Sequence, residues 1–140
     1  MAVRVRVRVR SLSTGSSITL VVLVNGGAES RKPTIVLGTE EARELGLYPP
    51  PPHSEIYEAV EASQIRYVYV VPDAVEIELL GDGGETLSKV VADVAVEEGI
   101  TEPLITDVTI DALGIQVVSF GKGLWRHVNG PKGKIRSSVA

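Results

Sequence analysis

The chain of 140 residues contains no cysteine, which excludes disulfide bonds and metal sites built from thiolates. No stretch is long and apolar enough to cross a bilayer. The first ten residues alternate Val with Arg, which differs from the apolar core of an export signal. The two histidines, His53 and His127, lie far apart without the spacing of metal ligands. We therefore expect a cytoplasmic protein with no membrane segment, metal or cofactor.

Asn, Gln and Met are also scarce, at two, two and one residues, whereas Glu, Arg and Val are frequent. Proteins of heat-loving organisms show the same depletion of thermolabile residues. The composition therefore favours a thermophilic source.

The net charge of −4 conceals a separation along the chain. Residues 1–10 carry four Arg, residues 121–140 carry five basic residues, and neither segment has an acid. Residues 11–120 hold all 18 acids against five bases. Such an acidic body repels phosphate, and Trp125 is the one aromatic residue in either basic end, so the pattern argues against a nucleic-acid partner. We expect charged terminal strands, which could face an acidic partner surface.

The hydrophobic pattern predicts a single, mainly β domain over 1–140, with its core in about 18–120 and basic terminal strands at 1–10 and 121–140. Expected strands cover 3–9, 18–24, 32–37, 56–60, 65–71, 74–80, 87–96, 115–120 and an edge segment at 134–139. Residues 61–64 and Gly81-Asp82-Gly83-Gly84 are the expected hairpin turns.

Two short helices are expected, each starting at a Thr cap and ending at a Gly. One follows Thr39 and ends at Gly46, and the other follows Thr106 and ends at Gly114. Each comes directly after a short apolar strand, so the same layout occurs twice. This repetition predicts a pseudo-symmetric, mainly β fold with two short helices.

The order of these motifs resembles the retropepsin-like aspartic proteases over about residues 18–120. Leu23-Val24-Asn25-Gly26-Gly27-Ala28 is similar to the apolar strand and Asp-Thr-Gly-Ala loop of that family. Residues 42–47, Ala-Arg-Glu-Leu-Gly-Leu, are similar to the helix that follows the loop. Residues 61–66 lie where the family has the turn of its flap, and 104–115 resemble its closing motif.

The resemblance implies a small closed, acid-protease-like β-barrel that acts as a homodimer on a peptide or protein substrate. In the family, each chain supplies one aspartate to a dyad, and two close carboxylates share one proton. By this resemblance Asn25, Gly26 and Gly27 occupy the catalytic loop, and Ala28, Ala62, Ser63 and Gln64 occupy the substrate-binding positions. The terminal strands 3–9 and 134–139 are the expected interface sheet.

The loop departs from the family pattern at the positions that carry its chemistry. Asn25 replaces the Asp, and an amide cannot ionise to act as a base. Gly26 replaces the Thr whose hydroxyl braces the loop, and Thr106 replaces a Gly of the closing motif. We therefore expect an inactive or impaired endopeptidase homologue.

Three other interpretations are open. The domain could be a peptide-binding pseudoprotease, or an unrelated small barrel in which Asn25 is only an ordinary turn, since Asn-Gly is a strong turn and hairpin signal. Alternatively, deamidation of Asn25, which the following Gly promotes, could restore a carboxylate.

Overall fold

The computed structural model describes residues 2–61 and 64–139. Its two helices are α1 (Thr39–Glu44) and α2 (Asp107–Ala112). Its strands are β1 (Arg4–Ser11), β2 (Ser17–Val24), β3 (Thr34–Leu37), β4 (Glu55–Glu61), β5 (Gln64–Leu80), β6 (Thr86–Glu97), β7 (Leu104–Ile105), β8 (Ile115–Ser119), β9 (Leu124–His127) and β10 (Arg136–Ser137). No helix in the described ranges is long and apolar enough to span a membrane.

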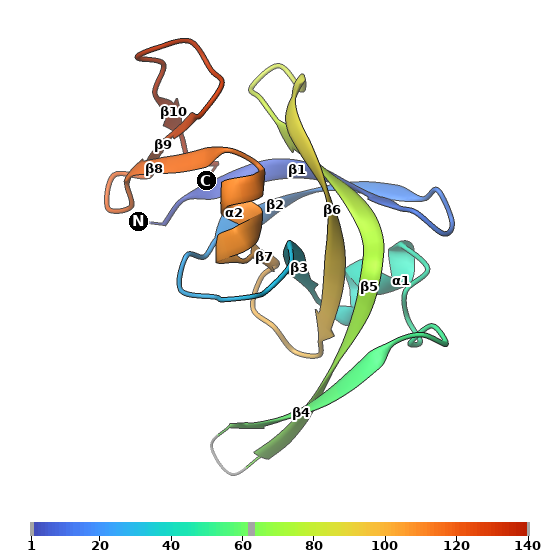
Figure 1. The fold of residues 1–140 in the computed structure, drawn as a ribbon. Helices are drawn as coiled ribbons and strands as arrows, with labels where there is room; N and C mark the ends of the chain where they lie inside the picture. The colour runs from blue at the N-terminus through green and yellow to red at the C-terminus, as the bar shows by residue number, and fades with distance from the viewer. Residues whose placement is uncertain (1, 62–63, 140) are drawn as a thin grey trace.

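Six strands form a closed barrel, in the order β1-β2-β7-β3-β6-β5, with β1 paired to β5 to close it. β4 extends this sheet beyond β5, and β8, β9 and β10 form a separate three-stranded sheet. Figure 1 shows the long β5 and β6 crossing the molecule, with α1 and α2 at opposite sides of the barrel. The predicted mainly β fold, a small closed barrel with two short helices, is confirmed.

β1 is an internal strand of the barrel, because it pairs antiparallel with β2 over Arg4–Arg10 and with β5 over Val7–Ser11. The alternation of its sequence explains this position: Val3, Val5, Val7 and Val9 are all buried, whereas the Arg side chains point away from the core. From Val7 onward, β1 has a neighbouring strand on both edges and cannot pair with a strand of a second chain. The prediction that residues 3–9 complete an interface sheet is therefore wrong over 7–9.

Three of the four arginines of β1, Arg4, Arg8 and Arg10, form ion pairs within the chain. Arg8 Nη1 lies 2.7 Å from Glu78 Oε2, and Arg10 Nη2 lies 3.2 Å from Glu76 Oε1, both on the neighbouring β5. Arg4 binds Glu102 through two hydrogen bonds of 2.8 and 2.9 Å, which lower the pKa of the Glu102 carboxyl. The acidic surface expected for these basic residues is thus part of the same domain.

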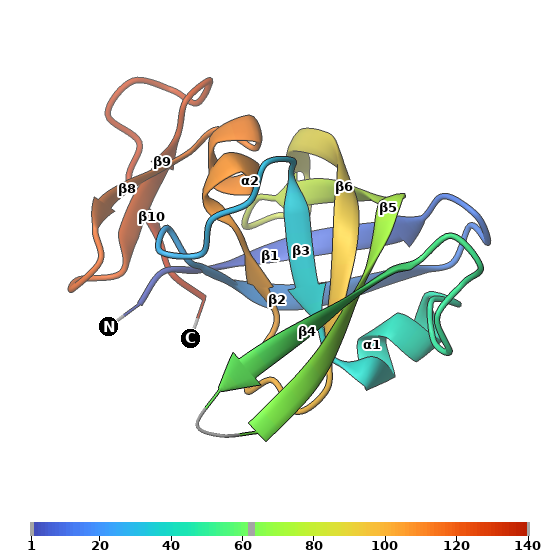
Figure 2. The ribbon, with the colours of Figure 1, turned by 60° about the horizontal axis from the view of Figure 1, so that its bottom comes forward.

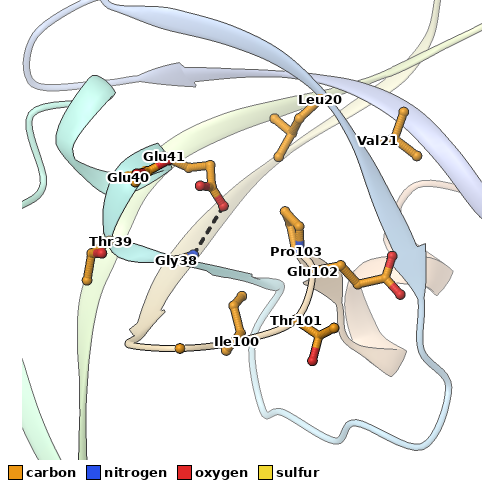
Figure 3. A pocket seen from close by; sticks show the side chains of 11 residues that line it. Leu20, Val21, Gly38, Thr39, Glu40, Glu41, Ile100, Thr101, Glu102 and Pro103 are labelled. Atoms are coloured by element: carbon orange, nitrogen blue, oxygen red, sulfur yellow. Dashed lines mark hydrogen bonds between the residues drawn. The ribbon is translucent and has the colours of Figure 1, made fainter.

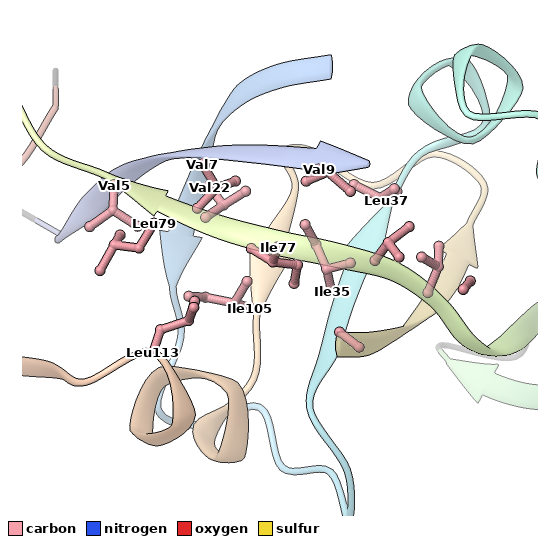
Figure 4. Close-up of a cluster of buried hydrophobic side chains, with 14 of the residues drawn as sticks. Val5, Val7, Val9, Val22, Ile35, Leu37, Ile77, Leu79, Ile105 and Leu113 are labelled. Atoms are coloured by element: carbon pink, nitrogen blue, oxygen red, sulfur yellow. The ribbon is translucent and has the colours of Figure 1, made fainter. Parts of the chain in front are cut away.

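The core fills the barrel with β-branched and Leu side chains from most strands and both helix ends (Figure 4). Ile35, Ile77, Ile105 and Leu113 are fully buried within it. Trp125 joins the same cluster from β9, so the three-stranded sheet packs against the barrel. Its indole Nε1 is a buried donor without a partner among the described residues.

The expected break between the strands 65–71 and 74–80 is absent, because β5 runs through Pro72 as one strand. A bulge interrupts its pairing with β6 between Val71 and Val75. Asp73 sits in this bulge with φ of 44°, and its N–H donates to Asp93 Oδ1 at 2.8 Å. Because residues in the bulge are not paired with β6, Pro72 can occupy it without an N–H to donate, and the strand continues.

Neither helix is capped by a Thr hydroxyl as predicted. Gly38, not Thr39, is the N-cap of α1, and its N–H donates to the Glu41 side chain at 3.3 Å. Thr106 is the N-cap of α2, but its hydroxyl points to other partners. Both helices end before a glycine in the left-handed region, at φ of 74° for Gly46 and Gly114, as expected.

Candidate functional site

Three neighbouring strands, β2, β7 and β3, each have one end on the same side of the barrel and position the loop that contains Asn25. β7 lies between β2 and β3, parallel to β2 through Leu23–Leu104 and Val24–Ile105 and antiparallel to β3 through Ile35–Ile105. Residues 25–33 therefore leave β2, pass around the end of β7 and return on its other side as β3 (Figure 1). The loop starts where β7 leads into α2.

The loop is fixed to β7 and α2 through its backbone. The Asn25 N–H donates to Ile105 O at 3.2 Å, and the Asp107 N–H donates to Ala28 O at 2.9 Å. A tight turn joins the Ala28 N–H to Asn25 O at 3.1 Å. Within this turn, Asn25 Oδ1 accepts the Gly27 N–H at 3.1 Å. Asn25 is half-buried, whereas Gly26 and Gly27 are exposed.

Asn25-Gly26 does not form a hairpin turn. The strands on either side, β2 and β3, are separated by β7 instead of being paired with each other. A hairpin turn of this sequence also needs positive φ, which neither Asn25 nor Gly26 adopts. Asn25 and Gly26 do belong to a tight turn, as the turn interpretation predicts, but this turn does not join two paired strands.

A chain of buried hydroxyls braces the loop against α2. Thr106 Oγ1 lies 2.6 Å from Ser30 Oγ and 2.9 Å from Thr109 Oγ1. Thr109 Oγ1 accepts the Thr34 N–H at 2.7 Å and donates to Thr34 O at 2.9 Å. Asp107 Oδ1 adds hydrogen bonds from the N–H groups of Ser30 and Val108. These side chains hold the loop in the absence of a hydroxyl at position 26.

We expect Thr109→Val to lower the free energy of unfolding by about 2–3 kcal/mol. Thr109 is fully buried, and the methyl group leaves the Thr34 N–H without its acceptor. Urea unfolding of the variant measures the loss, and Thr101→Val, at an exposed position, provides the matched control. A Thr109→Val variant as stable as the control would show that the hydroxyl chain contributes nothing.

The β4–β5 hairpin carries the predicted flap. Glu55–Glu61 pairs with Gln64–Val70, so the expected hairpin is present, with Gln64 at the start of β5. Ala62 and Ser63, two of the predicted substrate-binding residues, lie outside the described residues. Ala28 is half-buried in the loop after β2. Figures 1 and 2 place this loop and the far end of the hairpin on the same side of the barrel.

Tyr69 anchors the base of the hairpin to the end of α1. Its hydroxyl donates to Leu47 O at 2.6 Å, and its ring is nearly buried. Burial raises the pKa of Tyr69 to about 12 from an ordinary value of 10.0. The folded state therefore favours the protonated phenol, and this preference stabilises the fold fully below pH 10.0 and is lost as the pH rises toward about 12.

Tyr69→Phe is expected to lose about 1–2 kcal/mol at neutral pH, because Leu47 O loses its donor. Between pH 10 and 12 the variant should lose less further stability than the unmodified chain, since it has no phenol to ionise at this position. Urea unfolding at pH 7 and at pH 11 tests both statements. Equal pH dependence of the two proteins would contradict the assignment.

Two pockets flank the loop between β6 and β7. The first, of about 490 Å³, lies between this loop, β2 and the start of α1 (Figure 3). The second, of about 580 Å³, lies on the side of Leu23 and Leu104. Both pockets share the segment Gly99–Glu102, and their ionisable lining is acidic: Glu40, Glu41, Glu97 and Glu102. Asn25 lines neither of them.

The chemistry available at Asn25 is that of a neutral amide. Asn25 offers an oxygen already bonded to Gly27 and a side-chain N–H₂ donor, and neither group can take a proton from water. Asp107 Oδ1 accepts two backbone N–H groups, which fix this carboxylate against the loop. Among the described residues no group of three His, Asp or Glu side chains could hold a metal ion. Asn25 itself can therefore orient a ligand but cannot act as a general base.

The sequence matches no protein-family model. It also matches no curated protein. The interpretation of the site therefore depends on its own residues and geometry.

Sequence reasoning placed Asn25 correctly at the end of an apolar strand but missed the residues that hold its loop. Ser30 lay outside every expected element, Thr34 was only one residue of an expected strand, and Thr109 was only one residue of an expected helix. The spacing of Thr106 and Thr109, three apart at a helix start, is the one signal that could have paired them.

Proposed function

We propose that this chain is a homologue of the retropepsin-like aspartic endopeptidases that no longer hydrolyses peptides and works as a dimeric polypeptide-binding module. Its Asn25 loop retains the position of a catalytic loop, and the β4–β5 hairpin retains that of a flap. The cargo is an extended polypeptide segment.

The observation that carries this proposal is the insertion of β7 between β2 and β3, the two strands that the loop connects. Two strands are held apart by a third, and the loop between them presents Asn25 at the strand end, next to the start of α2. A simple hairpin turn would not need this topology. The arrangement supports the view that this loop belongs to a binding site, in which an amide replaces the family's aspartate.

The placement of other segments supports a dimer. In Figures 1 and 2 the 25–33 loop, the start of β1 and β10 lie in the left half of the molecule, and the far end of the β4–β5 hairpin lies at its bottom, left of the centre. A two-fold partner on this left side would bring two copies of the loop together and set the two hairpins over them. β1 itself stays within the barrel, so β10 and the loop supply the contact.

The absence of a carboxylate separates binding from hydrolysis. General acid–base catalysis contributes about 10²–10⁴ in rate, and two facing amides supply none of it. Donors and acceptors of the loop and hairpin can still hold a peptide backbone. Binding without cleavage is the expected behaviour.

The test incubates the chain with a fluorescent, permanently unfolded polypeptide at pH 4 and at pH 7. Anisotropy measures binding, and gel electrophoresis measures cleavage. We expect saturable binding and no fragments. Fragments produced by fresh protein would contradict the loss of hydrolysis, and the absence of binding at both pH values would contradict the binding role.

One further route to activity has a structural basis. Gly26 is exposed, and its backbone N–H, the group that attacks the Asn25 side chain during deamidation, donates no backbone hydrogen bond among the described residues. Under this hypothesis aged protein gains aspartate or isoaspartate at position 25. Peptide mapping after prolonged heating checks this, and unmodified Asn25 throughout would reject it.

A further inference from the structure

The outer edge of β4 is the open end of the barrel's sheet. β4 is the last strand in the sheet order and pairs only with β5, so the backbone N–H and C=O groups of its other edge have no strand partner in the part of the chain that the structure describes. Figure 2 shows the hairpin projecting from the barrel with β4 at its front. Such an edge is a template for a further strand.

The exposed side chains of β4 are partly apolar. Ile56 is 66% exposed and Tyr57 is 52% exposed, and because neighbours in a strand point to opposite faces, Ile56 lies on one face of the sheet and Tyr57 on the other. Edges that avoid pairing usually carry charged side chains, proline or a bulge, and β4 has neither proline nor a bulge between Glu55 and Glu61. Exposed apolar groups on an open edge favour a partner that covers them.

The charge of β4 selects the kind of partner. The strand carries Glu55, Glu58 and Glu61 and no basic residue. Pairing with β4 of a second copy would bring these like charges together, which destabilises a sheet. A strand with lysine or arginine would instead gain opposite charges along its length.

The barrel contains an internal example of this pairing. β1, with the sequence Arg-Val-Arg-Val-Arg-Val-Arg-Ser, lies antiparallel along β5, where Arg8 is directly opposite Glu78 and Arg10 directly opposite Glu76. Both pairs form ion pairs, at 2.7 and 3.2 Å. A basic, β-branched strand therefore docks on a glutamate-bearing strand within this molecule.

We propose that the outer edge of β4 binds an extended basic polypeptide segment by strand addition, with lysine or arginine alternating with β-branched residues. The inference deepens the proposed binding function by naming the class of its ligand and the strand that holds it. Backbone hydrogen bonds fix the segment, Ile56 covers its apolar residues on one face of the sheet, and Glu55, which shares the other face with Tyr57, selects its charge.

The probe is a labelled eight-residue peptide that alternates Lys and Val, titrated with the intact chain and followed by anisotropy. We expect binding that a Glu-Val peptide does not show. Glu55→Gln should weaken it about threefold, since it removes one charge pair. The matched control, Asp111→Asn, removes the same charge from another exposed position and should leave the affinity unchanged.

Backbone methylation separates strand addition from general charge attraction. An added strand uses the N–H groups of alternate residues, so of two Lys-Val peptides N-methylated on odd or on even residues, one should lose binding and the other should keep it. Equal binding of both methylated peptides would overturn the proposal, as would equal losses in Glu55→Gln and Asp111→Asn. Self-association that strengthens in the Glu55→Gln variant and blocks the peptide would instead assign the edge to a second copy.

Failure of this inference is distinguishable from failure of the proposed function. An unfolded polypeptide that binds while the Lys-Val peptide does not would remove β4 as the site and leave the binding module intact. If neither binds, both proposals fall.

Discussion

Asn25→Asp is expected to give the chain endopeptidase activity at acid pH, at least about 100-fold above that of the unmodified protein. The loop already accommodates a side-chain oxygen at this place, because Asn25 Oδ1 accepts the Gly27 N–H at 3.1 Å. An aspartate has the same shape and keeps this hydrogen bond. Two such carboxylates across a dimer would share one proton, which provides a base for water and an acid for the leaving amine.

Adding Gly26→Thr to this variant should raise the activity further. No atom lies within 4 Å of a Cβ built on Gly26, so a threonine fits, and its hydroxyl can brace the loop. Cleavage of an unfolded protein between pH 3 and 7 measures the effect, and Asn129→Asp, the other Asn-Gly in the chain, is the matched control. Inactivity of both the single and the double variant would mean that the Asn25 site lacks more than a carboxylate.

Ile105→Ala is expected to lower the free energy of unfolding by about 2–5 kcal/mol. Ile105 is fully buried in β7, opposite Val24 on one side and Ile35 on the other. The truncation leaves a cavity where β2, β7 and β3 lie side by side. Since Ile105 O also accepts the Asn25 N–H, the loop should become more mobile as well.

The same truncation at Ile56 provides the control. Ile56 is 66% exposed, so Ile56→Ala should change the stability by no more than about 0.5 kcal/mol. Urea unfolding compares the two variants, and amide hydrogen exchange at 25–28 reports on the loop. A loss at Ile105 as small as that at Ile56 would contradict the packing of β7 within the barrel.

Local patterns predicted most of the fold. The Val-Arg alternation of β1, the apolar run of β2 and the turn at Gly81–Gly84 all depend on residues close in sequence. The continuity of β5 through Pro72 could not be predicted, because a bulge opposite β6 makes it possible. Likewise, the position of β1 inside the barrel depends on glutamates of β5 about 70 residues away.

The candidate site was predicted in part. The strand that ends at Asn25 was evident from the sequence, but its insertion beside β7 results from tertiary pairing between segments about 80 residues apart. The bracing hydroxyls of Ser30, Thr106 and Thr109 were hidden for the same reason. The open edge of β4 follows from the sheet order, which no local pattern specifies.

The most direct test of the proposed dimer uses the absence of cysteine in the chain. In Asn25→Cys the only thiol lies in the loop, and a disulfide forms between two copies only if their Cα atoms approach within about 7 Å. We predict that mild oxidation converts this variant to a covalent dimer, while Asp82→Cys, in the exposed β5–β6 turn, stays largely monomeric under the same conditions. Asn25→Cys that remains monomeric, or that crosslinks no faster than Asp82→Cys, would contradict a dimer in which the two Asn25 loops meet.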